Sequence, residues 1–119
     1  MKYMLLIHQG DAPTPRSPKA WSRLSEDEQR SVYEDYRALN ETPGVTPGDQ
    51  LQPPEAATTV RVEDGRTLVT DGPFVAVKEA LGGWLIYEAD DLDAAIELAS
   101  RIPAARLGGA VEVRPIAEW

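Results

Sequence analysis

The sequence predicts an α+β fold of the ferredoxin-like type, with two split strand–helix–strand halves and an added β-hairpin. Apolar runs of strand length occupy residues 2–8, 81–88 and 110–116, and two segments with a helical apolar period separate them. A hairpin signal precedes the third core strand. This order predicts an antiparallel sheet with two helices on one face. At 119 residues, the chain has the length of a single domain, residues 1–119.

The first half of the chain contains a strand, a loop and a helix. Residues 2–8 form a compact apolar run that stops at turn residues, which is typical of a buried strand. Three prolines in residues 11–19 predict a loop. Ser25 and Glu28 have the spacing of a capping box. A helix over residues 26–40 follows, because apolar residues recur at helical spacing at Val32, Tyr36 and Leu39.

The middle of the chain is predicted to be a loop followed by a hairpin. Residues 45–55 are rich in proline and glycine, which favours a loop. Residues 57–62 and 66–70 are rich in β-branched residues, and Asp64-Gly65 between them is a strong hairpin signal.

The second half repeats the strand–helix–strand order. Residues 81–88 are apolar on both faces, which indicates a central strand. Asp90 or Asp91 caps a helix that ends before Pro103, and residues 110–116 alternate as a last strand. The predicted apolar stripe of this helix consists of Leu92, Ala95, Ile96, Ala99 and Ile102.

Strand alternation places apolar residues on both faces of the sheet. In the first strand, Tyr3, Leu5 and Ile7 share one side, and Met4 and Leu6 share the other. Two helices cover only one face. We therefore expect a homodimer that forms through the open face of the sheet.

Composition limits the classes of function. The net charge of −8 and the scattered basic residues disfavour nucleic-acid binding. The absence of cysteine excludes thiolate metal sites and cysteine nucleophiles. The N-terminal apolar run is far shorter than the ~20 residues of a membrane span, so we expect a cytoplasmic protein without membrane association. No nucleotide or haem motif is present, and we expect no cofactor.

A longer motif carries a family resemblance. Residues 70–84 read Thr-Asp-Gly-Pro-Phe-Val-Ala-Val-Lys-Glu-Ala-Leu-Gly-Gly-Trp, and residues 90–96 read Asp-Asp-Leu-Asp-Ala-Ala-Ile. Together with the start of the chain and Thr58-Thr59-Val60-Arg61, these segments resemble the DGPF proteins of the YCII-related family. The resemblance covers nearly the whole chain.

The resemblance implies a dimeric α+β barrel, in which two ferredoxin-like subunits pack their sheets together. Some relatives look like lyases or dehydrohalogenases with a His–Asp pair, and the fold also hosts lactone isomerases. Genes of DGPF proteins commonly lie beside extracytoplasmic-function sigma factors. This chain departs from the pattern in two places: Ala76 replaces a usual acidic residue, and residues 26–36 lack the histidine of the YCII enzymes.

His8 and Asp71 are the candidate catalytic residues. Histidine is the usual general acid or base near neutral pH, and His8 ends the first strand, where it would reach Asp71 if the Asp-Gly-Pro loop folds over it. Asp71 would act as a general base or orient one. The alternatives are a packed or solvated histidine and an aspartate that only stabilises its own turn.

Phe74, Lys78, Glu79 and Trp84 are the candidate ligand-binding residues. Lys78 or Glu79 would hold an anionic substrate or polarise a carbonyl, although the two also fit a solvated pair. Trp84 is expected to line a pocket, or to pack in the core or at the dimer interface. No spaced ligand pair predicts a metal site.

Two classes of function follow. One is a regulatory or small-ligand-binding dimer, with a sigma factor as a candidate partner and a small anionic or lactone-like compound as a candidate ligand. The alternative is a small-molecule lyase, isomerase or dehydrohalogenase that uses acid–base residues in a pocket between the sheet and the helices. The sequence leaves open whether the protein is an enzyme.

Overall fold

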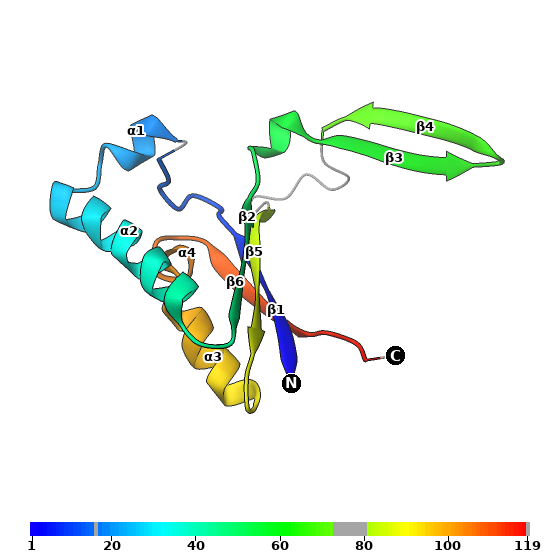
Figure 1. The fold of residues 1–119 in the computed structure, drawn as a ribbon. Coiled ribbons are helices and arrows are strands. Elements are labelled where there is room, and N and C mark those ends of the chain that lie inside the picture. The colour runs from blue at the N-terminus through cyan, green and yellow to red at the C-terminus, as the bar shows by residue number, and fades with distance from the viewer. Residues whose placement is uncertain (16, 73–80, 119) are drawn as a thin grey trace.

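The computed structural model describes residues 1–15, 17–72 and 81–118, and Figure 1 labels the elements along the chain. The strands are β1 (Lys2–His8), β2 (Val45–Gln50), β3 (Thr58–Glu63), β4 (Arg66–Asp71), β5 (Leu81–Glu88) and β6 (Ala110–Pro115). The helices are α1 (Pro18–Trp21), α2 (Glu26–Glu41), α3 (Leu92–Ser100) and α4 (Pro103–Arg106), with a 3-10 turn η1 (Pro54–Ala56) before the hairpin.

Four strands form the main sheet in the order β2-β5-β1-β6. Every neighbouring pair is antiparallel, with β5 and β1 in the centre. The helices α2 and α3 lie on the same side of this sheet (Figure 1). The predicted α+β fold of ferredoxin-like type is therefore confirmed, including the central position of residues 81–88.

The edge strand β2 was missed by the sequence analysis. Residues 45–55 were predicted as a loop because of their prolines and glycines, but residues 45–50 pair with β5. Proline is tolerated in an edge strand, because a residue whose backbone nitrogen faces solvent donates no hydrogen bond to a neighbouring strand. The pairing is also interrupted between Pro47 and Gln50, where the register shifts. The loop prediction was wrong because proline and glycine argue against a central strand, whereas β2 lies at the edge of the sheet.

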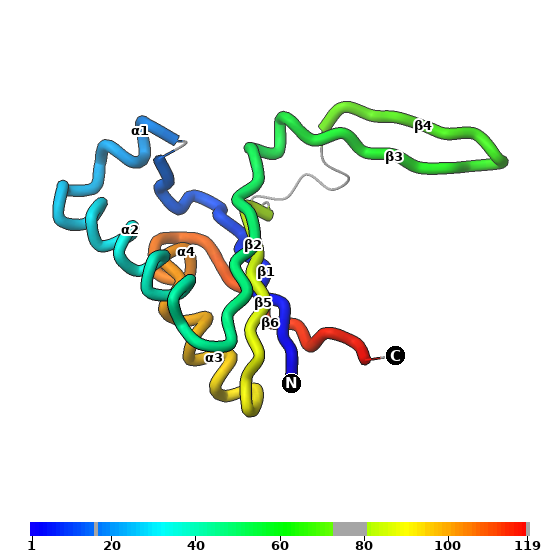
Figure 2. Tube along the Cα trace, in the orientation of Figure 1, coloured from blue at the N-terminus to red at the C-terminus, as the bar shows by residue number. Residues whose placement is uncertain are grey.

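The core lies between the sheet and the two long helices. Leu5 is fully buried and has Leu85 and Val113 as its cross-strand neighbours. Leu39 of α2 and Leu98 of α3 are buried in the same cluster. The tube in Figure 2 follows both helices along one face of the sheet. This layer covers one face only.

The helix starts agree with the predicted caps. The Ser25 side chain accepts the amide of Glu28 at 3.1 Å, and the Glu28 carboxylate accepts the amide of Ser25 at 2.9 Å. These hydrogen bonds lower the pKa of Glu28. At α3 the cap is Asp91, which accepts the amide of Ala94 at 2.8 Å. Both helices begin where a short polar side chain satisfies their free amides.

The predicted stripe of α3 is partly wrong. Ala95, Ala99 and Ile102 are buried as expected, but Leu92 and Ile96 are about half exposed. Leu98, absent from the predicted stripe, is fully buried. The helix is thus rotated about its axis relative to the predicted orientation, because packing against the sheet, rather than the apolar pattern alone, selects the inward face.

The opposite face of the sheet carries a group of partly buried apolar side chains that no helix covers (Figure 1). By strand alternation it includes Met4 and Leu6 of β1, together with Trp84 and Ile86, their partners on β5. We call Met4, Leu6, Trp84 and Ile86 the open-face cluster.

The predicted hairpin forms a separate two-stranded sheet of β3 and β4. Asp64 and Gly65 both have positive φ, 51° and 74°, as the tight turn between the strands requires. We call residues 58–71 the arm. It projects from the main sheet on the side opposite the helices (Figure 1).

Gly48 of β2 is predicted to be essential for the close packing of the edge strand. A Cβ at Gly48 would overlap the carbonyl oxygen of Trp84 and lie 2.5 Å from its ring carbons. We expect Gly48→Ala to lower the free energy of unfolding by about 1–3 kcal/mol, as overpacking does. Denaturant unfolding measures this loss. Thr46→Ala, at an exposed site on the same strand, should change it by no more than about 0.5 kcal/mol. Equal losses in the two variants would contradict the prediction.

Candidate functional site

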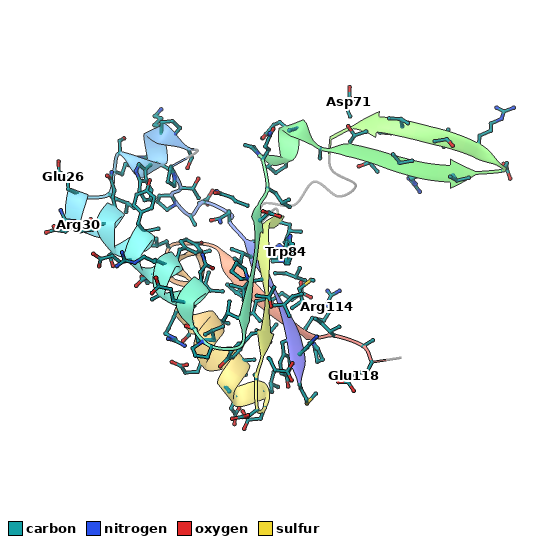
Figure 3. All side chains as sticks on the ribbon, in the orientation of Figure 1. Glu26, Arg30, Asp71, Trp84, Arg114 and Glu118 are labelled. Carbon is teal, nitrogen blue, oxygen red and sulfur yellow. The ribbon has the colours of Figure 1, made fainter. Side chains whose placement is uncertain are left out.

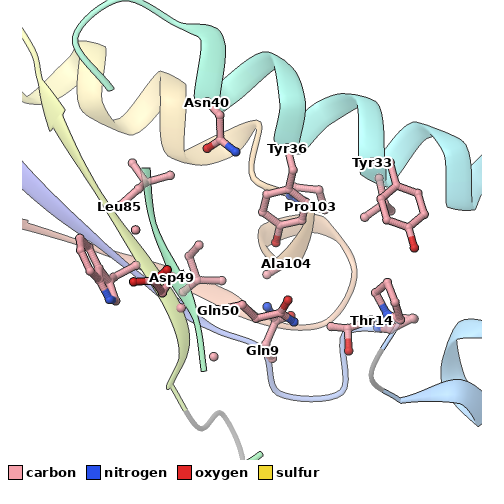
Figure 4. Close-up of a pocket in the computed structure, with 18 residues that line it drawn as sticks. Gln9, Thr14, Tyr33, Tyr36, Asn40, Asp49, Gln50, Leu85, Pro103 and Ala104 are labelled. Atoms are coloured by element: carbon pink, nitrogen blue, oxygen red, sulfur yellow. The ribbon is translucent and has the colours of Figure 1, made fainter. Parts of the chain in front are cut away.

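A cavity of about 300 Å³ lies between α2 and the sheet, at the end of the sheet where β1 and β2 stop and β5 begins. Figure 4 shows α2 above it and the strands with the loop after β1 below it. The apolar part of its wall comes from β1, the loop after it, α2, β5 and α4: Ile7, Pro13, Pro15, Val32, Leu85, Pro103 and Ala104. Concave apolar walls with a few polar groups are typical of ligand pockets.

The polar groups of the cavity are almost all uncharged. Tyr36 and Asn40 extend from α2 toward the sheet, and Gln9 and Gln50 lie on the other side (Figure 4). Thr14 and Tyr33 also line the wall, and Asp49 is the one charged residue among the described lining residues. Amides and hydroxyls both donate and accept hydrogen bonds, so this wall suits a ligand with carbonyl or hydroxyl groups.

Tyr36 is the polar centre of the cavity. Its burial raises the pKa of the phenol, and this outweighs the opposing effects of a hydrogen bond with Gln9 and of the Arg106 charge. The phenol therefore stays protonated well above neutral pH. Arg106 is itself bound to Asp35 at 2.6 Å.

The Gln9 side chain occupies space that a glycine on β5 leaves free. A Cβ at Gly82 would overlap Cγ of Gln9. Gly82 is buried on β5 and has no side chain, and this leaves the space in which Gln9 lies and meets Tyr36. Gly82 and the adjacent Gly83 thus shape the pocket wall.

His8 lies outside this cavity, with the open-face cluster. Its Nε2 is 3.4 Å from Oε1 of Glu112 on β6. Glu112 also accepts hydrogen bonds from Arg114, which, more than His8, holds the pKa of the Glu112 carboxyl below its usual value. The sequence analysis did not single out Glu112, although strand alternation could have placed it beside Leu6 and His8.

Asp71 lies at the base of the arm. It ends β4 opposite Thr58, and Figure 3 shows it beside the arm, above the main sheet. The turn after it is fixed by Gly72, which has φ 99°, donates its amide to Ala57 at 2.7 Å and accepts a bond from the Thr59 hydroxyl at 2.7 Å. The structure brings His8 next to Glu112 and places Asp71 on a different sheet. The catalytic roles of His8 and Asp71 stay predictions.

Of the four candidate ligand-binding residues, Trp84 falls within the described part of the chain. It borders the cavity, but strand alternation places its side chain on the opposite face of the sheet, in the open-face cluster, so its role stays a prediction. Phe74, Lys78 and Glu79 lie outside the described residues. Their roles also stay predictions. In the sequence, Tyr36 belongs to the apolar stripe of the predicted helix, Asn40 ends that helix, and Gln9 and Asp49 fall in predicted turns and loops. Only the fold brings these segments together.

Within residues 1–15, 17–72 and 81–118, none of the helices has the length and hydropathy that a membrane span requires. In the same ranges, no group of three or more His, Asp or Glu side chains is placed to hold a metal ion.

Comparison with known proteins gave two findings. The sequence model of the YCII-related domain matches residues 1–119. A protein of Rhizobium meliloti (strain 1021), described as uncharacterised protein R00369, is similar to this chain, with 35% identity over 120 residues. The alignment covers 98% of this chain and 93% of the relative.

The raised pKa of Tyr36 predicts a measurable pH dependence. Because the folded-state pKa exceeds the unfolded value of about 10, the contribution of this phenol to stability is complete below about pH 10 and is lost as the pH rises through the folded-state pKa. We expect Tyr36→Phe to remove the last component of the ultraviolet tyrosinate titration and to flatten the alkaline fall in unfolding free energy. Tyr33→Phe, which removes an exposed phenol, should leave that last component in place. A last component that persists in Tyr36→Phe would refute the assignment.

Proposed function

The chain belongs to the YCII-related domain family, and from that premise we propose that it is a dimeric protein that binds a small neutral ligand in the cavity between α2 and the sheet. The observation that carries the proposal is the cavity itself. It has an apolar wall and convergent uncharged polar groups, and its volume of about 300 Å³ is at the lower end for ligand pockets.

The chemistry of the wall favours a lactone-like compound over an anion. The protonated Tyr36 phenol and the Asn40 amide can donate hydrogen bonds to a carbonyl oxygen. An anion would lack a cationic partner among the described lining residues, and Asp49 would repel it. A neutral ester or hydroxyl compound leaves no charge unpaired.

The dimer follows from the open-face cluster. Four large apolar side chains lie side by side on the two central strands, where no helix covers them. Contiguous apolar patches of this kind mark interaction sites. A second copy presents an identical patch, so a two-fold contact would cover both at once.

A regulatory role, an association with an extracytoplasmic-function sigma factor and a cytoplasmic location stay predictions. The resemblance to DGPF proteins is what supports the sigma-factor association.

The alternative function is that of a lyase, isomerase or dehydrohalogenase. It would place acid–base residues in the cavity, but His8 and Asp71 are not among the described lining residues. Ligand binding alone requires no acid–base residue, and the hydrogen-bonding groups that line the cavity are sufficient for it. We therefore rank ligand binding first.

A matched pair of ligands tests the binding proposal. We expect neutral five- and six-membered lactones to raise the melting temperature in a thermal-shift assay, because a ligand that binds only the folded state stabilises it. Their ring-opened hydroxy acids, which carry a carboxylate, should have no effect. Stabilisation by the hydroxy acids alone would contradict the neutral-ligand proposal.

The same assay locates the site. Asn40→Leu should abolish the shift, whereas Glu41→Leu, the neighbouring position outside the cavity wall, should retain it. Loss of the shift in Asp71→Ala, but not in Asn40→Leu, would move the ligand to the Asp-Gly-Pro segment and favour the enzymatic alternative.

Two isoleucines provide a matched test of the dimer. Ile86 belongs to the open-face cluster, and Ile96 is half exposed on α3, in the helix layer. We expect sedimentation velocity at micromolar concentration to show a dimer for the wild type and for Ile96→Lys, and a monomer for Ile86→Lys, which places a charge in the contact. A monomeric wild type would refute the dimer.

A further inference from the structure

One face of the arm carries three valines beyond the Thr58–Asp71 pair at its base, and the other face is mainly polar. In the β3–β4 ladder, Val60 pairs with Val69 and Val62 pairs with Thr67. Side chains of paired residues share a face, so these four residues form what we call the valine face. The other face carries Arg61 opposite Leu68, and Glu63 opposite Arg66. Such alternation is typical of a strand pair that packs one face against another element and exposes the other face to solvent.

The subunit itself does not cover the valine face. Val60, Val62 and Val69 are 60%, 66% and 63% exposed. A two-stranded ribbon is marginally stable alone and normally packs its apolar face against another element. The radius of gyration is 16.1 Å, against about 13–14 Å for a compact domain of this length, which agrees with an arm that extends away from the core.

The direction of the arm indicates what covers it. The arm leaves the end of β2 through η1 and projects on the same side of the sheet as the open-face cluster (Figures 1 and 2). A partner that packs on the open face would therefore lie alongside the arm.

The arm is longer than the distance between two sheets that pack face to face. Six extended residues span about 20 Å, whereas face-to-face sheets pack about 10 Å apart. An arm of this length extends past the open face of the partner to the flank of its sheet. The open-face contact alone would leave the valine face in water.

The areas also favour a second copy that contacts both surfaces. A patch of four strands about 4.8 Å apart and about 20 Å long covers roughly 400 Å² in projection. The valine face adds roughly 200 Å², on the basis of the same strand dimensions. Their accessible area, which exceeds the projection, approaches the roughly 800 Å² per partner of a standard stable interface.

We propose that the arm is a dimer clasp, in which the valine face of each copy packs against the flank of a second copy of this chain held at the open-face cluster. The clasp rests on the dimer proposed above. It assigns the arm to the assembly of the protein rather than to ligand binding. By two-fold symmetry, each copy contributes one arm and receives one.

Neighbouring positions on β4 test the clasp. Val69 lies on the valine face and Leu68 on the polar face, and both are exposed. Val69→Glu should weaken the dimer, measured by sedimentation equilibrium, by about tenfold or more, as charges in the centre of contacts do. Leu68→Glu adds the same charge opposite Arg61, and its dissociation constant should stay within about threefold of the wild type. Circular dichroism and melting curves check that both variants fold.

A cross-link identifies the occupant of the valine face. A photo-reactive residue at Val62, in a mixture of unlabelled and isotope-labelled copies, should yield mixed-isotope peptides that join the arm to another chain. A dimeric wild type with an unchanged dissociation constant in Val69→Glu, or with cross-links only within one copy, overturns the clasp and leaves the open-face dimer intact. Equal weakening by Val69→Glu and Leu68→Glu would also overturn it, because the valine face would then have no special role. A monomeric wild type would refute both proposals.

Discussion

The packing of two helices against one face of a four-stranded sheet is the constraint on which the rest of this molecule depends. Leu5 at the centre of the sheet is fully buried beneath that layer, together with Leu39 and Leu98. Apolar side chains on both faces of the central strands cannot all be covered this way. One-sided coverage thus produces both features proposed as functional. The cavity lies within the covered side, and the open-face cluster lies on the other.

The sequence predicted those elements whose signals are local. The capping box at Ser25 and Glu28, the Asp64-Gly65 turn and the apolar run of residues 81–88 each depend on residues close together in the chain, and each was found where expected. Edge strand β2 has no such signal. Its proline and glycine are unfavourable in a strand by propensity, and its pairing is fixed by β5, more than thirty residues away in the sequence.

The candidate site was harder to predict, because its residues come from distant segments. Gln9 and Tyr36 meet only because the turn after β1 folds under α2, and Gly82 leaves the space for that contact. In the same way, the pairing of β1 with β6 places His8 beside the carboxylate of Glu112, a contact that no local sequence signal indicates. The residue types indicate which acid–base and hydrogen-bonding groups the chain contains. The register of the sheet determines which of these side chains lie side by side.

The electrostatics of the chain and of the cavity favour the same kind of ligand. A net charge of −8 repels anions at long range, and Asp49 repels them at the cavity wall. The burial that raises the pKa of Tyr36 would likewise disfavour a buried carboxylate, because removing either charge from water costs free energy unless a cation compensates it. A neutral compound with a carbonyl group avoids both costs and still accepts the hydrogen bond that the protonated phenol offers. The environment that keeps Tyr36 uncharged would therefore also favour the uncharged ligand that we propose.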